Sequence, residues 1–221
     1  MNNNETLLRE GAGRLGVVLT DQAVDRLLRY AAELIKWNRR INLIGKGSED
    51  TLIETHFLDS LTILPYCNYP APGLMDVGSG AGFPGLAVKC AHPDLPVILV
   101  EPREKRATFL RHMVRTLHLE GIRIVEARLD ENHPDLAPLR QNIPCITGRA
   151  VSSISDFLTL TAPFSTATGV VICMKGARAE EDLAAWQKGA QPGSYQLTDI
   201  RAIPLPFSGH LRQLVIFTHN K

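Results

Sequence analysis

Apolar and polar positions follow two different rhythms along the 221-residue chain. Up to about residue 66, apolar side chains recur every three or four positions, which predicts amphipathic helices. From Leu74 onward, short apolar runs alternate with helical patterns, which is typical of a parallel sheet covered by helices. The sequence therefore predicts an α/β protein: an N-terminal helical cap, residues 1–66, and a doubly wound sheet domain, residues 67–221, with helices on both faces.

The helical cap is expected to hold three helices. The first spans about Glu5 to Leu15, and the second begins after Thr20, whose hydroxyl suits the free amides of a helix start. The third helix carries His56 and Asp59 at positions i and i+3. We interpret these two residues as a structural hydrogen-bonded pair, with a proton-handling pair as the alternative.

The sheet domain is expected to alternate strands and helices and to close with a hairpin. The predicted strands are Leu74–Val77, Val97–Val100, Ile122–Val125, Cys145–Thr147 and Val170–Met174, and the predicted hairpin strands are Tyr195–Ile203 and Leu211–Thr218. The predicted helices are Pro84–Ala91, Arg103–Leu119, Ile154–Thr161 and Ala179–Gln187. Ligands of such sheets bind outside the carboxyl ends of the strands, so residues at those ends are the candidates for a site.

A glycine-rich loop, Asp76-Val77-Gly78-Ser79-Gly80-Ala81-Gly82-Phe83-Pro84-Gly85, follows the first strand. Glycines serve where the backbone takes positive φ or lies against a ligand, and the next helix points its first amides at the loop. Gly80 to Gly85 also fits the dinucleotide fingerprint G-x-G-x-x-G. Asp76 argues against a pyrophosphate and for a ligand with cationic groups, such as S-adenosylmethionine. A glycine turn without any ligand is the alternative.

Three further strand ends carry groups that suit an adenosyl amino acid. Glu101, after the second strand, is placed to bind two ribose hydroxyls. After the third strand come Arg128-Leu129-Asp130-Glu131, where a carboxylate can accept from an adenine amino group. Arg149, after the fourth, is free for a carboxylate. Lys175 follows the fifth strand. The alternatives are a solvated acid and an arginine that caps a helix.

Composition narrows the class of protein. The net charge of +1 indicates no general affinity for nucleic acid, so any such footprint must be local. The four cysteines share no metal-ligand spacing, and we expect buried, reduced thiols and no metal. The polar N-terminus does not read as a signal peptide, and no apolar run reaches the length of a membrane span. We therefore expect a cytoplasmic protein without a membrane partner.

Several motifs together resemble the RsmG (GidB) family of bacterial methyltransferases. The motifs are the glycine loop, Trp37-Asn38 with Asn42-Leu43, His56-Phe57-Leu58-Asp59-Ser60, Lys105-Arg106, Arg149-Ala150 and Lys175-Gly176. The resemblance runs from about Leu15 to Phe217. It implies a class I (Rossmann-like) methyltransferase fold and methylation of a guanine N7 in 16S ribosomal RNA. Carried over by position, the residues that would contact S-adenosylmethionine are Gly78, Phe83, Leu129, Asp130 and Arg149. Together with the residues argued above, the predicted cofactor set is Asp76, Gly78, Gly80, Gly82, Phe83, Glu101, Leu129, Asp130 and Arg149.

Two positions depart from the family pattern. Glu101-Pro102 stands where the family often has Asp-Ser, which keeps the acid. Arg212-Gln213-Leu214 stands where it often has Arg-His-Leu, which leaves the role of Arg212 open.

A local excess of basic residues marks a candidate RNA surface. From Arg103 to Arg128 the chain has seven Lys or Arg residues against three Glu. Cations at a helix N-terminus oppose its dipole, so stability does not explain Arg103, Lys105 and Arg106. We expect these three residues to bind RNA phosphates. The alternative is that Arg106 pairs with Glu101 or Glu104.

The implied chemistry needs no general base, because guanine N7 offers a lone pair and carries no proton. No residue is therefore assigned as catalytic, and Arg149 and Lys175 are candidates for positioning the acceptor. The expected partner is 16S ribosomal RNA within the small subunit, and the expected state is a monomer. Three alternatives stay open: a non-catalytic S-adenosylmethionine or nucleotide sensor, a methyltransferase acting on protein or a small molecule, and a nicotinamide-dependent dehydrogenase, which Asp76 disfavours.

Overall fold

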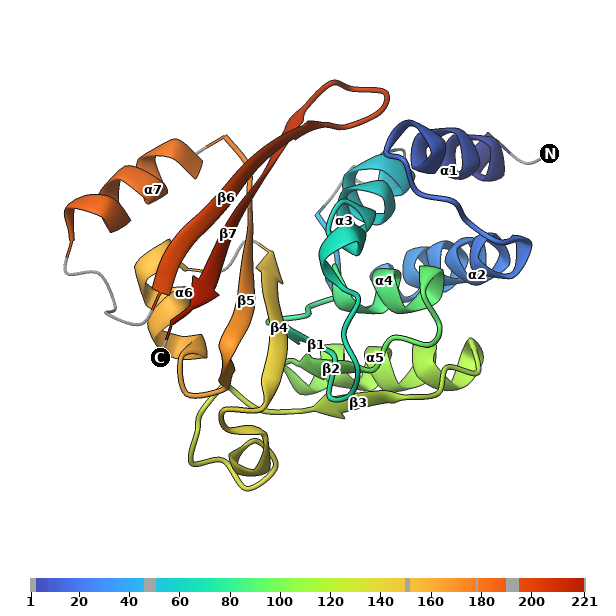
Figure 1. The fold of residues 1–221 in the computed structure, drawn as a ribbon. Coiled ribbons are helices and arrows are strands. Elements are labelled where there is room, and N and C mark those ends of the chain that lie inside the picture. Colours follow the sequence, from blue (N-terminus) through green and yellow to red (C-terminus); the bar gives the residue numbers. More distant parts are fainter. Residues whose placement is uncertain (1–2, 46–50, 150–151, 178, 190–194, 221) are drawn as a thin grey trace.

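The computed structural model describes residues 3–45, 51–149, 152–177, 179–189 and 195–220. One sheet of seven strands, ordered β3-β2-β1-β4-β5-β7-β6, runs through the molecule (Figure 1). Its strands are β1 (Leu74–Val77), β2 (Val97–Val100), β3 (Ile122–Val125), β4 (Ile143–Arg149), β5 (Ser165–Lys175), β6 (Tyr195–Pro204) and β7 (Leu211–His219). β1 to β5 pair in parallel, and β7 inserts antiparallel between β5 and β6.

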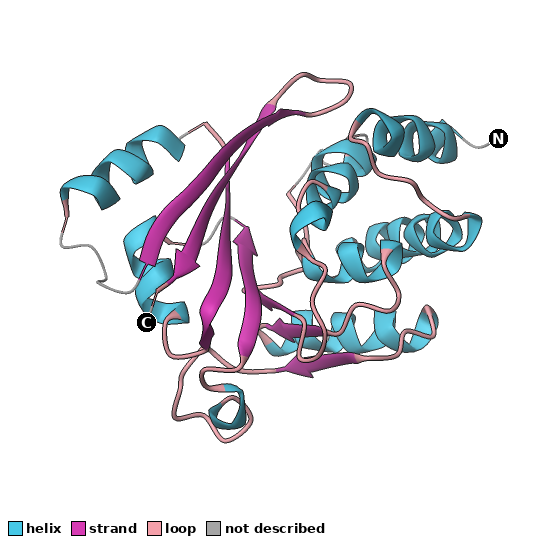
Figure 2. Ribbon diagram, in the orientation of Figure 1, coloured by secondary structure: helices cyan, strands magenta, loops and turns pink. Residues whose placement is uncertain are grey.

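Helices cover both faces of this sheet, as the sequence predicts (Figure 2). α1 (Asn3–Arg14), α2 (Asp21–Asn38), α4 (Gly85–Ala91) and α5 (Glu104–Thr116) contribute to one buried cluster, and α6 (Ile154–Thr161) and α7 (Ala179–Lys188) contribute to the other. Thr20 caps α2, because its hydroxyl accepts from the Ala23 amide at 3.1 Å. The α/β class and the order of elements are confirmed.

The third cap helix differs from the expected regular helix. A π-helical segment, η1 (Ile53–Leu58), leads into the single turn α3 (Asp59–Leu61) and a short 3₁₀ turn, η2 (Leu64–Tyr66). The wider turn of a π-helix rotates residues three apart away from a common face. The predicted His56–Asp59 hydrogen bond is therefore wrong: each of these side chains bonds to an arginine instead.

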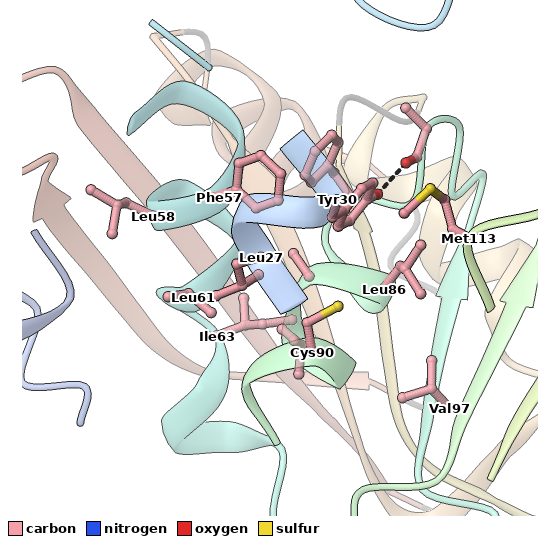
Figure 3. Close-up of a cluster of buried hydrophobic side chains, with 14 of the residues drawn as sticks. Leu27, Tyr30, Phe57, Leu58, Leu61, Ile63, Leu86, Cys90, Val97 and Met113 are labelled. Atoms are coloured by element: carbon pink, nitrogen blue, oxygen red, sulfur yellow. Dashed lines mark hydrogen bonds between the residues drawn. The ribbon is translucent and has the colours of Figure 1, made fainter. Parts of the chain in front are cut away.

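The cap and the sheet share one hydrophobic core (Figure 3). Tyr30 of α2 stacks on Phe83 of the glycine loop, with ring centroids 5.4 Å apart and an angle of 8° between the planes. Phe57 meets both rings edge-on, at 5.1 and 5.2 Å. Because core residues from both segments interlock, the boundary at residue 66 stays a prediction about domain organisation.

The closing hairpin of β6 and β7 reaches across to the cap (Figure 1). In its turn, the amides of Phe207 and Ser208 donate to Glu54 Oε1 at 2.7 and 2.8 Å. The Arg14 guanidinium lies over the Phe207 ring, 4.9 Å from its centroid. The turn of the hairpin is thereby fastened to the N-terminal cap.

The sequence predicts buried, reduced cysteines, no metal site and no membrane span. All four cysteines are buried free thiols, and burial raises the pKa of Cys90 and of Cys173 to about 12. Within the described ranges, no group of three or more His, Cys, Asp or Glu side chains is arranged to hold a metal ion. No helix in those ranges is long and apolar enough to cross a membrane.

Candidate active site

The glycine loop between β1 and α4 adopts a conformation that depends on its glycines. Gly78, Gly80 and Gly82 have φ values of 72°, 60° and 97°, a region that other residues rarely adopt. Gly80 faces open space: the atom nearest to a Cβ placed there is Arg106 Nη1, at 3.7 Å. Gly82 faces the core, where a Cβ would overlap the Tyr30 hydroxyl. Gly80 is therefore on the open side of the loop, and Gly82 anchors the loop to α2.

Asp76 lies beneath this loop and is completely buried. Its Oδ2 accepts from the Gly85 amide at 2.9 Å, at the start of α4, while Oδ1 has no hydrogen-bond partner. Burial raises the pKa of this carboxyl to about 7. From the sequence we expect Asp76 to be a charged group beside the ligand. Because the group is buried and readily neutralised, it disfavours a pyrophosphate less than we predicted.

Glu101, at the end of β2, organises the same loop from the other side. Its Oε2 accepts from the Gly80 amide at 2.8 Å and its Oε1 from the Arg103 amide at 2.9 Å. A carboxylate has about four acceptor sites, so each oxygen keeps one for a ligand hydroxyl. Glu101 therefore stands where the sequence predicts a ribose-binding acid, next to Gly80.

The predicted adenine-side residues follow β3. Leu129 is buried, whereas Asp130 is exposed and accepts from the Asn132 amide at 2.9 Å through Oδ1. Phe83, by contrast, is buried between the loop and the cap, where it stacks on Tyr30 and His56. Phe83 therefore packs the glycine loop against the helical cap.

We expected Arg149 to be free to bind a carboxylate of the ligand. The structure instead pairs it with Asp59, in a cluster of charged side chains. Asp59 is fully buried. Its Oδ2 accepts hydrogen bonds from Arg149 Nη1 at 3.0 Å and from Arg212 Nη2 at 2.8 Å, and its Oδ1 accepts one from Arg212 Nε. The Arg149 guanidinium also donates to the Thr55 carbonyl at 3.2 Å and to His56 Nδ1 at 2.9 Å. One carboxylate faces two guanidinium groups, so the cluster keeps a net positive charge. Ala150, the other half of the Arg149-Ala150 motif, lies outside the described residues.

His56 is a neutral member of this cluster. Burial, and then the nearby Arg149 charge, lower its pKa to about 4. The ring is therefore uncharged near neutral pH, and its Nδ1 is available to accept from Arg149. The alternative of a His56–Asp59 proton-handling pair does not fit this geometry, since the two side chains are bridged by Arg149.

A cleft of about 810 Å³ opens at the carboxyl ends of β4 and β5. Its lining residues are Thr55, His56, Arg149, Ser152, Ser153, Met174, Lys175, Gly176, Ala177, Glu181, Asp182 and Arg212. Lys175 Nζ donates to the Ser152 carbonyl at 2.7 Å and pairs with Asp182 at 2.8 Å. The structure thus brings Arg149 and Lys175 into one cleft, as their strand-end positions predict.

Sequence reasoning missed Asp182 and Glu181 as cleft residues and left Arg212 undecided. No local signal assigns the two acids, which read as the ordinary acidic first turn of a helix. Arg212 could have been found through the buried Asp59, whose charge needs partners that the cap itself does not supply.

The predicted basic residues lie around a smaller pocket of about 340 Å³. It is lined by Arg40, Ile41 and Asn42, after α2, and by Arg103, Glu104, Lys105 and Arg106, at the start of α5. No carboxylate among the described residues forms an ion pair with Arg103, Lys105 or Arg106. The alternative pairing of Arg106 with Glu101 or Glu104 is thus not found. We call this surface the basic rim.

The strand order, the glycine loop after β1 and the acid after β2 define a class I methyltransferase fold. Solved structures agree. A SAM-dependent methyltransferase from Aquifex aeolicus matches with a TM-score of 0.56 and 15% identity, covering 86% of this chain and 98% of that one. The ribosomal protein L11 methylase from Lactobacillus delbrueckii matches with a TM-score of 0.54 and 13% identity, covering 79% and 81%.

The chain belongs to the GidB family, described as rRNA small subunit methyltransferase G, whose family model matches residues 23–205. Ribosomal RNA small subunit methyltransferase G of Desulfotalea psychrophila is 45% identical over 210 residues, covering 95% of each chain. The protein of the same name from Acetivibrio thermocellus is 36% identical over 210 residues, covering 95% of this chain and 86% of its own. The family resemblance inferred from the motifs is confirmed.

Proposed function

We propose that this protein transfers the methyl group of S-adenosylmethionine to N7 of a guanine in 16S ribosomal RNA. One observation carries the proposal: Arg149, which lines the large cleft, is in contact with Phe83, a residue of the glycine loop. The Arg149 guanidinium lies 5.0 Å from the centroid of the Phe83 ring, with the loop on one side and the cleft on the other. A donor site and an acceptor site that share a wall are what direct methyl transfer requires. The family name supports ribosomal RNA as the acceptor.

The residues around the loop fit S-adenosylmethionine, which supplies an electrophilic methyl group when bound. Glu101 keeps acceptor sites for the two ribose hydroxyls, and we assign Leu129 and Asp130 to the adenine, as the family resemblance implies. The open side of the loop, at Gly78 and Gly80, admits the close approach of the methionyl part. The completely buried Asp76 supports the loop from beneath by accepting from the Gly85 amide at 2.9 Å. Gly82 and Phe83 fix the loop on the cap.

Arg149 lies next to the glycine loop and also lines the large cleft. Its hydrogen bonds to Asp59 and His56 hold the guanidinium at the boundary between loop and cleft. It can thus orient the acceptor on the cleft side and contribute charge on the loop side, as the family resemblance implies. Lys175, held by Asp182, is the second positioning candidate.

The reaction needs alignment and no proton removal, because N7 attacks with its own lone pair. Correct placement of two reactants contributes up to roughly 7–11 kcal/mol to catalysis. His56 is neutral and engaged with Arg149, so it serves as a positioning residue and not as a base. The target guanine must be unpaired or splayed from its helix to enter the cleft.

Further parts of the proposal concern the setting of the reaction. We propose a cytoplasmic monomer that acts on 16S ribosomal RNA within the small subunit and uses no metal. A non-catalytic sensor and a methyltransferase for protein or small molecules are the competing functions. Turnover excludes the sensor, and the identity of the methylated acceptor excludes the other methyltransferase.

The decisive experiment is transfer of labelled methyl groups onto small subunits from cells that lack the gene. We expect label in the RNA that digests to 7-methylguanosine, and free 16S ribosomal RNA as a second acceptor decides the form of the substrate. Thermal melts should show stabilisation by S-adenosylmethionine, about 2.7 kcal/mol at 100 times its Kd, and none by nicotinamide dinucleotides. Label in protein, or binding without turnover, would reject the proposal.

The basic rim yields a separate prediction about RNA binding. Lys105→Ala with Arg106→Ala should lower the affinity for RNA or subunits and reduce its salt dependence by roughly one unit of slope per lost phosphate contact. The affinity for S-adenosylmethionine should stay within a few fold. Both affinities are measured at two salt concentrations.

The matched control for this prediction is Arg111→Ala with Arg115→Ala, which removes the same charge from the same helix outside the rim. This control should leave the RNA affinity nearly unchanged. Loss of donor binding with unchanged RNA binding in the Lys105/Arg106 variant would place these cations in the donor pocket instead.

A further inference from the structure

The large cleft has two chemically different walls. The end of β4 contributes Arg149 and the start of β7 contributes Arg212, beside His56 of the cap, whereas the start of α7 contributes Glu181 and Asp182. Figure 1 shows α7 and the cap on opposite sides of the upper ends of β4 and β5. The cationic wall borders the glycine loop through Arg149 and Phe83. The acidic wall is therefore the side of the cleft away from the donor.

Of the carboxylates in and around this cleft, Glu181 stands apart. Asp59 is held by two arginines and Asp182 by Lys175 at 2.8 Å. Glu181 is exposed and lines the cleft, and it makes no ion pair with any cation of the described residues. Arg178, three positions earlier, lies outside those residues. Glu181 thus presents acceptor oxygens to whatever enters the cleft.

Guanine matches this polarity. Its Watson–Crick edge carries two adjacent donors, N1–H and the 2-amino group, which a carboxylate can accept together, while its major-groove side carries the acceptors N7 and O6. With the donor edge on the acidic wall, N7 and O6 face the cationic wall and the donor loop. Adenine has an acceptor at N1 and no 2-amino group, so the same carboxylate disfavours it.

We propose that the cleft is the binding site for the target base and that Glu181 selects guanine by accepting hydrogen bonds from N1–H and the 2-amino group. This inference rests on the proposed function and adds the group that recognises the acceptor. Glu181 touches the base and not the methyl donor, so its removal impairs acceptor recognition alone.

The test compares Glu181→Gln with Glu180→Gln, an exposed neighbour outside the cleft lining. Glutamine keeps the size of the side chain but replaces one acceptor oxygen with a donor. Because a hydrogen bond to a charged group is worth more than a neutral one, Glu181→Gln should lower single-turnover methylation at subsaturating RNA roughly 10- to 100-fold. Glu180→Gln should behave as wild type. S-adenosylmethionine affinity should be unchanged in both, which also shows that the variants are folded.

A substrate with inosine at the target position distinguishes recognition of the base by Glu181 from a purely structural role of Glu181. Once the modified guanine is located, RNA is assembled with inosine there, which lacks only the 2-amino group. Wild type should methylate inosine roughly 10-fold more slowly than guanine, and Glu181→Gln should show a much smaller difference. An unchanged guanine-to-inosine ratio in Glu181→Gln, or weakened donor binding, overturns the inference while the proposed function stands. No guanine methylation by wild type rejects the proposed function, and this inference with it.

Discussion

Gly82→Ala is expected to lower the melting temperature by roughly 6–12 °C, which corresponds to about 3 kcal/mol for a chain of this size. Two costs combine. The φ of 97° is strained for any residue with a Cβ, and that Cβ would overlap the Tyr30 hydroxyl and come within 2.8 Å of Leu86 Cβ. Donor binding should weaken as well, because the loop cannot keep its anchor on α2. Thermal melts with and without S-adenosylmethionine measure both effects.

Two comparison variants separate these costs. Gly80→Ala has the backbone strain alone, since no atom lies within 3.7 Å of the added carbon, and should cost about 1–2 kcal/mol. Tyr30→Phe removes the overlapping hydroxyl and also its hydrogen bond to the Ala81 carbonyl. In the double variant, Tyr30→Phe should partly restore the stability lost in Gly82→Ala. Equal melting temperatures for Gly82→Ala and wild type would show that the loop does not pack on α2 as described.

Asp59→Asn is expected to cost about 3–5 kcal/mol of folding free energy, the usual result of removing one partner of a buried ion pair. The substitution leaves the Arg149 and Arg212 guanidinium groups facing one another without a countercharge, with side chains only 16% and 17% exposed. Urea denaturation measures the loss. Methylation should fall as well, because both arginines line the cleft.

Two further variants make this result specific. Asp182→Asn removes the partner of Lys175, which keeps its hydrogen bond to the Ser152 carbonyl, and should cost less than Asp59→Asn. Arg212→Gln should cost less in the Asp59→Asn background than in wild type, since it relieves the repulsion between the arginines. A loss below 1 kcal/mol for Asp59→Asn would contradict the buried cluster.

The sequence predicts most of the central sheet because the signals there are local. β1, β2 and β3 match their predicted bounds, since each is a short, mainly apolar run with glycine, proline or a charged residue directly before and after it. β5 is longer than predicted: its first residues, Ser165 to Gly169, carry no hydrophobic pattern, and Ser165 pairs with Ile143 of β4. Only Ser165 of this stretch pairs with β4, and the register shifts before Val170, so a local irregularity and not a hydrophobic pattern sets the start of β5.

The site was predicted where one segment builds it and missed where several segments meet. The glycine loop and Glu101 are neighbours through paired strands, so their positions follow from the βαβ pattern. Arg149 and Asp59 are 90 residues apart, and only the folded cap shows that Arg149 is already paired. Asp76 was assigned correctly to the loop, but its complete burial follows from the packing of α4 and β2 around it.

The bond between Arg212 and Asp59 has a consequence for the order in which the chain is completed during synthesis. These residues are 153 positions apart, as are Glu54 and Phe207, and Arg14 donates to the Pro206 carbonyl across 192 positions. Contacts of such length form late, since the ribosome releases the N-terminal segment first. A nascent chain that stops before β7 can carry the glycine loop between β1 and α4, but it lacks Arg212, one of the two arginines that line the large cleft and hold Asp59. We therefore expect acceptor binding to be the last property the molecule acquires, gained only when its final strand has left the ribosome.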